Sequence, residues 1–172
     1  MSSWEIEEDD WADPPEAGDV LIVDDDASIR TMLGFVFDDA GCSVVEAADG
    51  AEALDALRHR PPALMVLDLM MPGIDGVEVL RRREAEGLAP DTRVLILTAK
   101  LDTQDAVWCW DLGADEYVTK PVDPDQLLRN GLVLLRLTPD EIRHNREVGL
   151  AEARRLDALE AALRPGTRWG RS

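Results

Sequence analysis

Residues 63–76 of the chain read ALMVLDLMMPGIDG. An apolar run from Ala63 to Leu67 leads to a single carboxylate, Asp68, and a proline and a glycine follow at positions 72 and 73. A short apolar run bounded by turn residues is typical of a strand that is buried on both faces, and proline and glycine end such a strand. We therefore expect Asp68 at the carboxyl end of a buried strand, where open α/β sheets form their functional sites.

The same alternation of a short apolar run and a helical segment occurs five times. We predict strands at residues 20–23, 42–48, 63–67, 93–97 and 116–119. Helices are predicted to follow them, from about 29 to 37, 50 to 60, 77 to 87, 102 to 112 and 123 to 137. Strands that alternate with helices in this way form a parallel sheet with helices on both faces. The expected fold is therefore a doubly wound α/β domain over residues 19–137.

The flanking segments differ from this domain in composition. Residues 1–18 are acidic, contain two adjacent prolines and show no periodicity, so we expect a disordered arm. Thr138-Pro139-Asp140-Glu141 is a helix-start signal with a capping box, and we predict a helix from there to about Leu163. Ile142, Leu156, Leu159 and Leu163 suggest one apolar stripe, interrupted near Asn145 and Gly149. This helical extension and tail, residues 138–172, could pair between two protomers, fold back on the domain, or lead to an output domain.

Composition limits the functional classes. The net charge of the 172-residue chain is −18, which argues against direct binding of nucleic acid. The two cysteines, Cys42 and Cys109, fit neither a disulfide framework nor a metal motif. No run approaches the roughly 20 apolar residues that span a membrane, and the first residues do not resemble a signal peptide. We expect a cytoplasmic protein that does not bind a membrane.

Charged and hydroxyl side chains stand at the ends of four predicted strands. These side chains are Asp24 and Asp25, Asp68, Thr98 and Lys120. Taken singly, each has an ordinary structural explanation, such as capping the next helix. Taken together, they should converge in one crevice at the carboxyl edge of the sheet.

The chemistry of this group suits phosphoryl transfer. Three carboxylates within about 4 Å of one another repel by roughly 4 kcal/mol per pair at an effective dielectric constant near 20. Oxygen ligands of this kind select Mg²⁺ or Mn²⁺. Phosphoryl transfer needs mainly positioning and charge compensation, and Lys120 and Thr98 could contact phosphoryl oxygens. We expect Asp68 to be the nucleophile that accepts the phosphoryl group.

The segments LIVDDDASIR, VLDLMMPGIDG, VLILTAK and GADEYVTKP strongly resemble the receiver domain of two-component response regulators. The resemblance covers about residues 19–137 and implies a flavodoxin-like (βα)₅ fold with strand order 2-1-3-4-5. It implies that Asp68 is the phosphorylated residue and that Lys120 pairs with the phosphate. It also implies a metal site formed by Asp24, Asp25, Asp68 and the backbone carbonyl of Met70.

The resemblance further implies a switch. Thr98 would move toward the phosphate and Tyr117 would turn inward, which would repack the face formed by the fourth helix, fifth strand and fifth helix. The phosphoryl donor would be a histidine kinase or a histidine phosphotransfer protein, and the output would be a downstream protein partner or a homodimer. Such a protein is a switch in a phosphorelay and does not turn over a separate substrate. Trp108 should point outward from the fourth helix, either as an interface anchor or against the C-terminal extension.

An enzyme remains the alternative. LIVDDDAS nearly meets the opening motif of haloacid-dehalogenase-like phosphatases, with Asp24 as the nucleophile. Ser28, however, stands where that motif has threonine, and the segments MMPGIDG and TKP would have no explanation. A third interpretation, a binding module that keeps only the fold, leaves the full set of strand-end residues unexplained.

Overall fold

The computed structural model describes residues 18–99 and 103–163. The predicted disordered arm, except Gly18, and the tail beyond Leu163 lie outside the described residues. The strands are β1 (Asp19–Val23), β2 (Ser43–Ala47), β3 (Leu64–Asp68), β4 (Arg93–Thr98) and β5 (Glu116–Thr119). The helices are α1 (Ala27–Asp39), α2 (Gly50–His59), α3 (Gly76–Glu86), α4 (Thr103–Asp111), α5 (Pro124–Arg136) and α6 (Pro139–Leu163).

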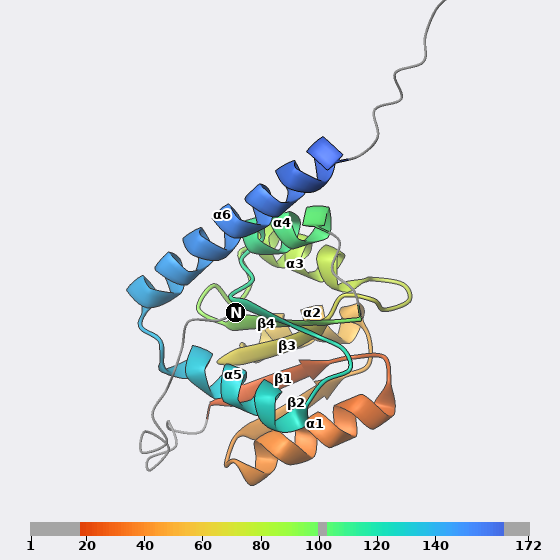
Figure 1. Cartoon of the computed structure of the whole chain (residues 1–172). Helices are drawn as coiled ribbons and strands as arrows, with labels where there is room; N and C mark the ends of the chain where they lie inside the picture. Colours follow the sequence, from red (N-terminus) through yellow and green to blue (C-terminus); the bar gives the residue numbers. More distant parts are fainter. Residues whose placement is uncertain (1–17, 100–102, 164–172) are drawn as a thin grey trace, which may run out of the picture.

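The five strands form one parallel sheet in the order β2-β1-β3-β4-β5. The predicted doubly wound fold and strand order are therefore confirmed. Helices α1 and α5 cover one face of the sheet, and α2, α3 and α4 cover the other, as Figure 1 shows. Helix α6 is additional to this pattern and lies across α4.

The central strand β3 supplies side chains to both layers of the core. Met65 and Leu67 pack with the residues of α2 and α3, whereas Leu64 and Val66 pack with those of α1 and α5. Alternate residues of a strand point to opposite faces of the sheet, so a strand that is covered on both sides must be apolar throughout. This is why the run that precedes Asp68 contains no polar residue.

Aspartates mark the starts of four helices. The side chains of Asp26, Asp49, Asp75 and Asp123 accept hydrogen bonds from the first-turn amides of α1, α2, α3 and α5, respectively. An N-cap of this kind satisfies amides that have no partner within the helix. In α5 the side-chain amide of Gln126 donates to the side-chain oxygen of Asn130 one turn later.

The capping box that begins α6 is also confirmed. The amide of Glu141 donates to Thr138 Oγ1 at 3.3 Å, and the amide of Thr138 donates to Glu141 Oε2 at 2.8 Å. Of the three arrangements left open for this extension, the structure has the second, since α6 packs on α4 of the same chain. Of the residues of the predicted apolar stripe, Ile142 is buried, whereas Leu156, Leu159 and Leu163 are exposed.

No helix among the described residues is long and apolar enough to cross a membrane.

Gly76 begins α3 directly against the backbone of β3. A Cβ atom at this position would lie 2.4 Å from the carbonyl oxygen of Asp68 and 2.7 Å from the Cα of Leu69. Only a residue without a side chain fits, because backbone atoms cannot move aside as the end of a side chain can. The loop between Asp68 and α3 is therefore held close to the strand end.

We expect Gly76→Ala to lower the free energy of unfolding by about 1–3 kcal/mol, the usual cost of overpacking a close contact. Gly34→Ala in α1 is the matched control, because the tight contact of its Cβ would be with the flexible end of Glu46 at 3.1 Å, and Val44 lies at an ordinary contact distance of 3.8 Å. That control should be neutral or stabilising, since alanine favours the helix by up to about 1 kcal/mol. Urea unfolding measures both values, and equal effects of the two substitutions would contradict this account of the loop.

Candidate functional site

The groups predicted at the strand ends lie at one edge of the sheet. Asp24 follows β1, Asp68 ends β3, Thr98 ends β4, and Lys120 follows β5. Strands β1 and β3 are neighbours, and the connections from them run in opposite directions along the sheet. This is the switch point at which doubly wound sheets bind their ligands.

Lys120 joins the two buried aspartates. Its Nζ donates to Asp24 Oδ2 at 2.9 Å and to Asp68 Oδ2 at 3.2 Å. The side chains of Asp24 and Asp68 are 1% and 2% exposed, and that of Lys120 is 20% exposed. Two carboxylates buried side by side repel each other, and the shared ammonium group offsets this repulsion.

The second oxygen of each aspartate is held by the main chain. Asp24 Oδ1 accepts a hydrogen bond from the amide of Asp26 at 2.9 Å, and Asp68 Oδ1 accepts one from the amide of Met70 at 3.0 Å. In both loops the donor lies two residues after the aspartate, as in an Asx turn. The turn that ends each strand therefore also orients its carboxylate.

Arg30, which was not among the predicted site residues, supports the site from α1. Its Nη1 donates to the main-chain oxygen of Asp24 at 2.7 Å, and its Nε pairs with Glu46 at 3.4 Å. The available signal was an arginine one turn into the helix that follows an acidic strand end. Its contact with the carbonyl of Asp24 fixes the loop after β1.

The charges at the site shift two pKa values. Burial raises the pKa of Asp68 and the charge of Asp24 raises it further, against the lowering effects of the Met70 amide and of Lys120. Burial lowers the pKa of Lys120, but its hydrogen bond to Asp24 and the charges of both aspartates outweigh burial, so this pKa is raised. Lys120 therefore carries a positive charge at neutral pH, next to the carboxylate of Asp68.

Asp24, Asp25 and Asp68 form a group that fits a metal ion. Each offers a carboxylate oxygen, and the three oxygens lie within 4.8 Å of one another. Asp25 is exposed, whereas the other two are buried, so the group opens to solvent on one side. Three carboxylates with one lysine leave an excess of negative charge, and oxygen donors of this kind suit a hard divalent cation.

Thr98 and Trp108 line a groove next to this group. The groove has a volume of about 280 Å³ and also includes Met70 and Arg81. Thr98 is fully buried at the end of β4, and its carbonyl oxygen accepts a hydrogen bond from the amide of Lys120 at 2.7 Å. Trp108 is 49% exposed, so its predicted outward orientation is confirmed.

Tyr117 lies away from the carboxylates. Its side chain is 42% exposed, and its ring meets that of Trp110 edge to face, with 6.3 Å between the ring centres. Trp110 is buried. Trp110, together with Ala106 of the same helix, forms an apolar cluster with Ala153 of α6.

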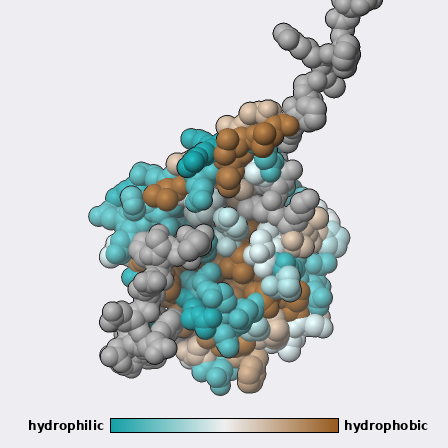
Figure 2. All heavy atoms as spheres, in the orientation of Figure 1, coloured by the Kyte–Doolittle hydropathy of each residue, from teal (hydrophilic) through white to brown (hydrophobic). Residues whose placement is uncertain are grey.

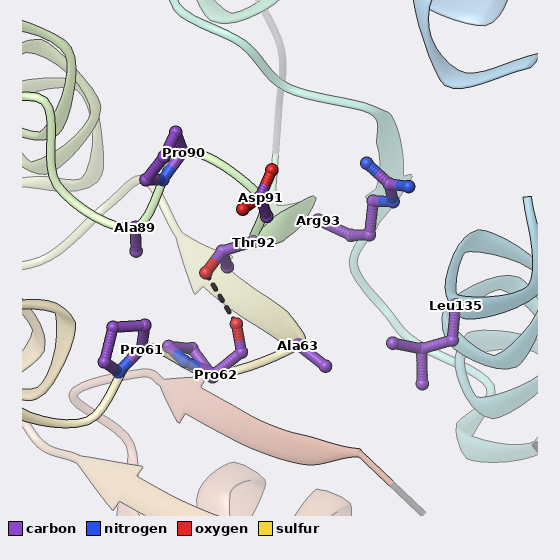
Figure 3. A pocket seen from close by; sticks show the side chains of 9 residues that line it. All are labelled: Pro61, Pro62, Ala63, Ala89, Pro90, Asp91, Thr92, Arg93 and Leu135. Atoms are coloured by element: carbon purple, nitrogen blue, oxygen red, sulfur yellow. Dashed lines mark hydrogen bonds between the residues drawn. The ribbon is translucent and has the colours of Figure 1, made fainter. Parts of the chain in front are cut away.

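A larger cavity of about 510 Å³ lies at the opposite edge of the sheet, where β3 and β4 begin (Figure 3). Its wall includes three prolines, and inside it Thr92 Oγ1 donates to the carbonyl oxygen of Pro62 at 2.6 Å. Asp91 is the single carboxylate among the lining residues. The clustered carboxylates thus identify the other edge as the chemical site.

Comparison with known proteins shows the family to which this fold belongs. A family model described as the response regulator receiver domain matches residues 20–130. The DNA-binding response regulator MtrA of Mycobacterium tuberculosis is 41% identical over 122 residues, which are 71% of this chain and 52% of MtrA. The phosphate regulon transcriptional regulatory protein PhoB of Pseudomonas aeruginosa is 37% identical over 131 residues, which are 76% of this chain and 57% of PhoB.

Solved structures show the same likeness. The chemotaxis protein CheY4 of Vibrio cholerae matches with a TM-score of 0.62 and 32% identity, covering 66% of this chain and 95% of CheY4. The receiver domain of the putative response regulator NarL from Mycobacterium tuberculosis matches with a TM-score of 0.64 and 28% identity, covering 72% of this chain and 100% of the NarL receiver domain.

The fold and the strand-end group define a response regulator receiver domain, and the chain belongs to this family. Phosphorylation on an aspartate is the general function of the family. The chain spans about half the length of the curated relatives it matches.

Two substitutions at the site should change stability in opposite directions. Lys120→Met leaves two buried carboxylates without their shared donor and should cost about 1–3 kcal/mol of unfolding free energy at pH 7. Asp68→Asn should stabilise the protein at pH 7. Because the pKa of Asp68 is raised by folding, ionisation of this carboxyl group opposes folding as the pH rises.

Urea unfolding at pH 7 and pH 5, without added metal, measures these effects. The loss caused by Lys120→Met should shrink at the lower pH, because protonation of Asp68 removes one of the two unpaired charges. Lys120→Arg, which keeps the positive charge, is the control and should lose less unfolding free energy than Lys120→Met. A destabilising effect of Asp68→Asn at pH 7 would contradict the charge balance described here.

Proposed function

We propose that Asp68 accepts a phosphoryl group from a phosphohistidine of a histidine kinase or a histidine phosphotransfer protein. The observation that carries this proposal is the Lys120 ammonium group 3.2 Å from the buried Asp68 carboxylate, in a chain of the receiver family. In the reaction, a carboxylate oxygen of Asp68 attacks phosphorus, an O–P bond forms, and the N–P bond of the donor breaks with imidazole as the leaving group. The product is an acyl phosphate.

The residues around Asp68 have separate roles in this proposal. The charge of Lys120 compensates phosphoryl oxygen charge, and the hydroxyl group of Thr98 donates to another phosphoryl oxygen. The amide of Met70 keeps one Asp68 oxygen in place, which leaves the other directed toward Lys120 and the incoming group. Positioning and charge compensation of this kind account for most catalysis of phosphoryl transfer.

Asp24, Asp25, Asp68 and the backbone carbonyl of Met70 would hold Mg²⁺, or Mn²⁺ in its place. The ion supplies positive charge that offsets the charge on the phosphoryl oxygens. The three carboxylate oxygens within 4.8 Å of one another support this assignment.

The proposed output is a change in protein contacts. Thr98 moves toward the phosphate, Tyr117 turns inward, and the surface formed by α4, β5 and α5 repacks for a downstream protein or a second protomer. The receiver unit is residues 19–137, and residues 138–172 form an extension. The net charge of −18 favours protein contact over direct nucleic-acid binding, and the phosphorelay would operate in the cytoplasm.

In this proposal the protein is a switch that catalyses only its own phosphorylation and dephosphorylation. A haloacid-dehalogenase-like phosphatase would instead use Asp24 as its nucleophile. In the structure Asp24 and Asp68 have the same pattern of hydrogen bonds, each from a main-chain amide two residues later and from Lys120, so these bonds do not distinguish the two carboxylates. The match to the receiver family supports Asp68.

Binding of beryllofluoride, a mimic of a phosphoryl group, tests the proposal by calorimetry in the presence of Mg²⁺. The wild-type protein should bind about one equivalent, and Asp68→Asn should abolish binding because beryllium bonds to an anionic carboxylate oxygen, which the amide side chain does not have. Asp24→Asn should weaken binding through loss of a metal ligand. Asp39→Asn, an exposed residue at the end of α1, is the control and should bind as the wild type does.

Turnover of a phosphate ester is measured on the same four proteins. We expect none. Hydrolysis that is lost in Asp24→Asn but kept in Asp68→Asn would assign the phosphatase function and overturn the proposal.

A further inference from the structure

Helix α6 packs antiparallel along α4. The start of α4 meets the later turns of α6, since Thr103 Oγ1 donates to Asp157 at 3.2 Å and to Glu160 at 3.0 Å. The end of α4 meets an earlier turn, since Arg154 pairs with Asp111 at 3.1 Å. Figure 1 shows α6 crossing the outside of α4. The extension therefore covers the α4 side of the surface that the proposed function assigns to output.

Close packing, rather than a leucine stripe, forms the centre of this contact. Ala106, Trp110 and Ala153 form a buried cluster. A Cβ atom at Gly149 would lie 2.5 Å from the Trp110 ring, so the indole lies directly against the backbone of α6. Gly149 interrupts the apolar pattern in the sequence because this is where the helix touches α4.

Two polar contacts fix the position of α6. Arg146 Nε donates to Asp115 Oδ1 at 2.6 Å, and the side-chain amide of Asn145 donates to the carbonyl oxygen of Asp115 at 2.7 Å. Asp115 is fully buried, and its other oxygen accepts a hydrogen bond from the amide of Val94 on β4 at 2.7 Å. A buried carboxylate needs such partners. Helix α6 supplies some of the hydrogen bonds that Asp115 of the receiver unit requires.

Tyr117 borders the same contact. Its ring stands against Trp110, and it lines a small cavity of about 50 Å³ together with Gly149, Glu152 and Leu156 of α6. An inward turn of Tyr117 would take an aromatic contact from Trp110 and enlarge this cavity. Cavities in packed contacts are destabilising, so the conformation of Tyr117 and the docking of α6 are linked.

We propose that α6 is the built-in partner of the α4–β5 surface, docked on it before phosphorylation and released when Asp68 carries a phosphoryl group. This inference rests on the proposed function of Asp68. Release would uncover Trp110 and the docked face of α6. Figure 2 shows a hydrophobic region on α6. Leu156, Leu159 and Leu163 of this helix are exposed and would then adjoin a second apolar face.

Hydrogen exchange of the full chain, followed by mass spectrometry of α4 and α6 peptides, tests the release. With Mg²⁺ and beryllofluoride the amides of α6 should exchange about tenfold faster or more, because an isolated helix of this length opens readily in water. Peptides from β3 should stay protected, which shows that the receiver unit remains folded. Asp68→Asn should show no response in α6.

Gly149→Leu tests the docking without any phosphoryl mimic. The leucine side chain would collide with Trp110, so α6 should exchange rapidly from the start. Ala158→Leu, at an exposed position on the same helix, is the matched control and should keep α6 protected. Leucine has a higher helix propensity than glycine, so faster exchange in Gly149→Leu reports undocking and not a weaker helix.

The outcomes separate the two proposals. Calorimetric binding of beryllofluoride at Asp68 with unchanged or slower exchange of α6 would overturn the release and leave the phosphoryl acceptor in place. Absence of binding would overturn both. Continued protection of α6 in Gly149→Leu would overturn the docking contact. Light scattering measures the oligomeric state in the absence of beryllofluoride. If the wild-type protein is a dimer and Gly149→Leu is a monomer, the contact between α4 and α6 joins two chains. That result would overturn the proposal that α6 is a partner within one chain.

Discussion

The ammonium group of Lys120 between the buried carboxylates of Asp24 and Asp68 is the interaction on which the site depends. It brings the end of β5 to the ends of β1 and β3, which belong to the central part of the sheet. Without a cation, two carboxylates with side chains only 1% and 2% exposed would oppose folding. In the proposed reaction the same charge compensates a phosphoryl group, so stability and chemistry would depend on one residue.

Much of this arrangement could be predicted from the sequence. The apolar runs predict the strands, since a parallel strand covered on both faces admits no polar residue until it ends. Asp24, Asp68 and Thr98 stand at the ends of such runs, and Lys120 follows the short edge strand β5, so their convergence at one edge follows from the parallel sheet. The bridge formed by Lys120 could not be predicted, because its geometry depends on how the loop after β5 lies over β1 and β3.

The position of α6 could not be predicted for a different physical reason. A helix that docks through glycine against an indole ring leaves no leucine pattern, and Asn145 and Gly149 looked like interruptions of a stripe. Their contacts with Asp115 and Trp110 show that they are the docking residues. The leucines that suggested the stripe are exposed. A prediction from hydrophobic periodicity assumes that large apolar side chains form the contact. Helix α6 is docked largely by small and polar side chains, so the periodicity does not indicate its docked face.

The central claim is that Asp68 carries an acyl phosphate, and reductive trapping tests it most directly. The protein is incubated with Mg²⁺ and acetyl phosphate and then treated with borohydride, which reduces an acyl phosphate of aspartate to homoserine. Peptide mass spectrometry locates the reduced residue. We predict reduction at position 68 alone, dependent on both Mg²⁺ and the phosphoryl donor. Reduction at position 24, or none at position 68 after treatment with the donor, would contradict the account.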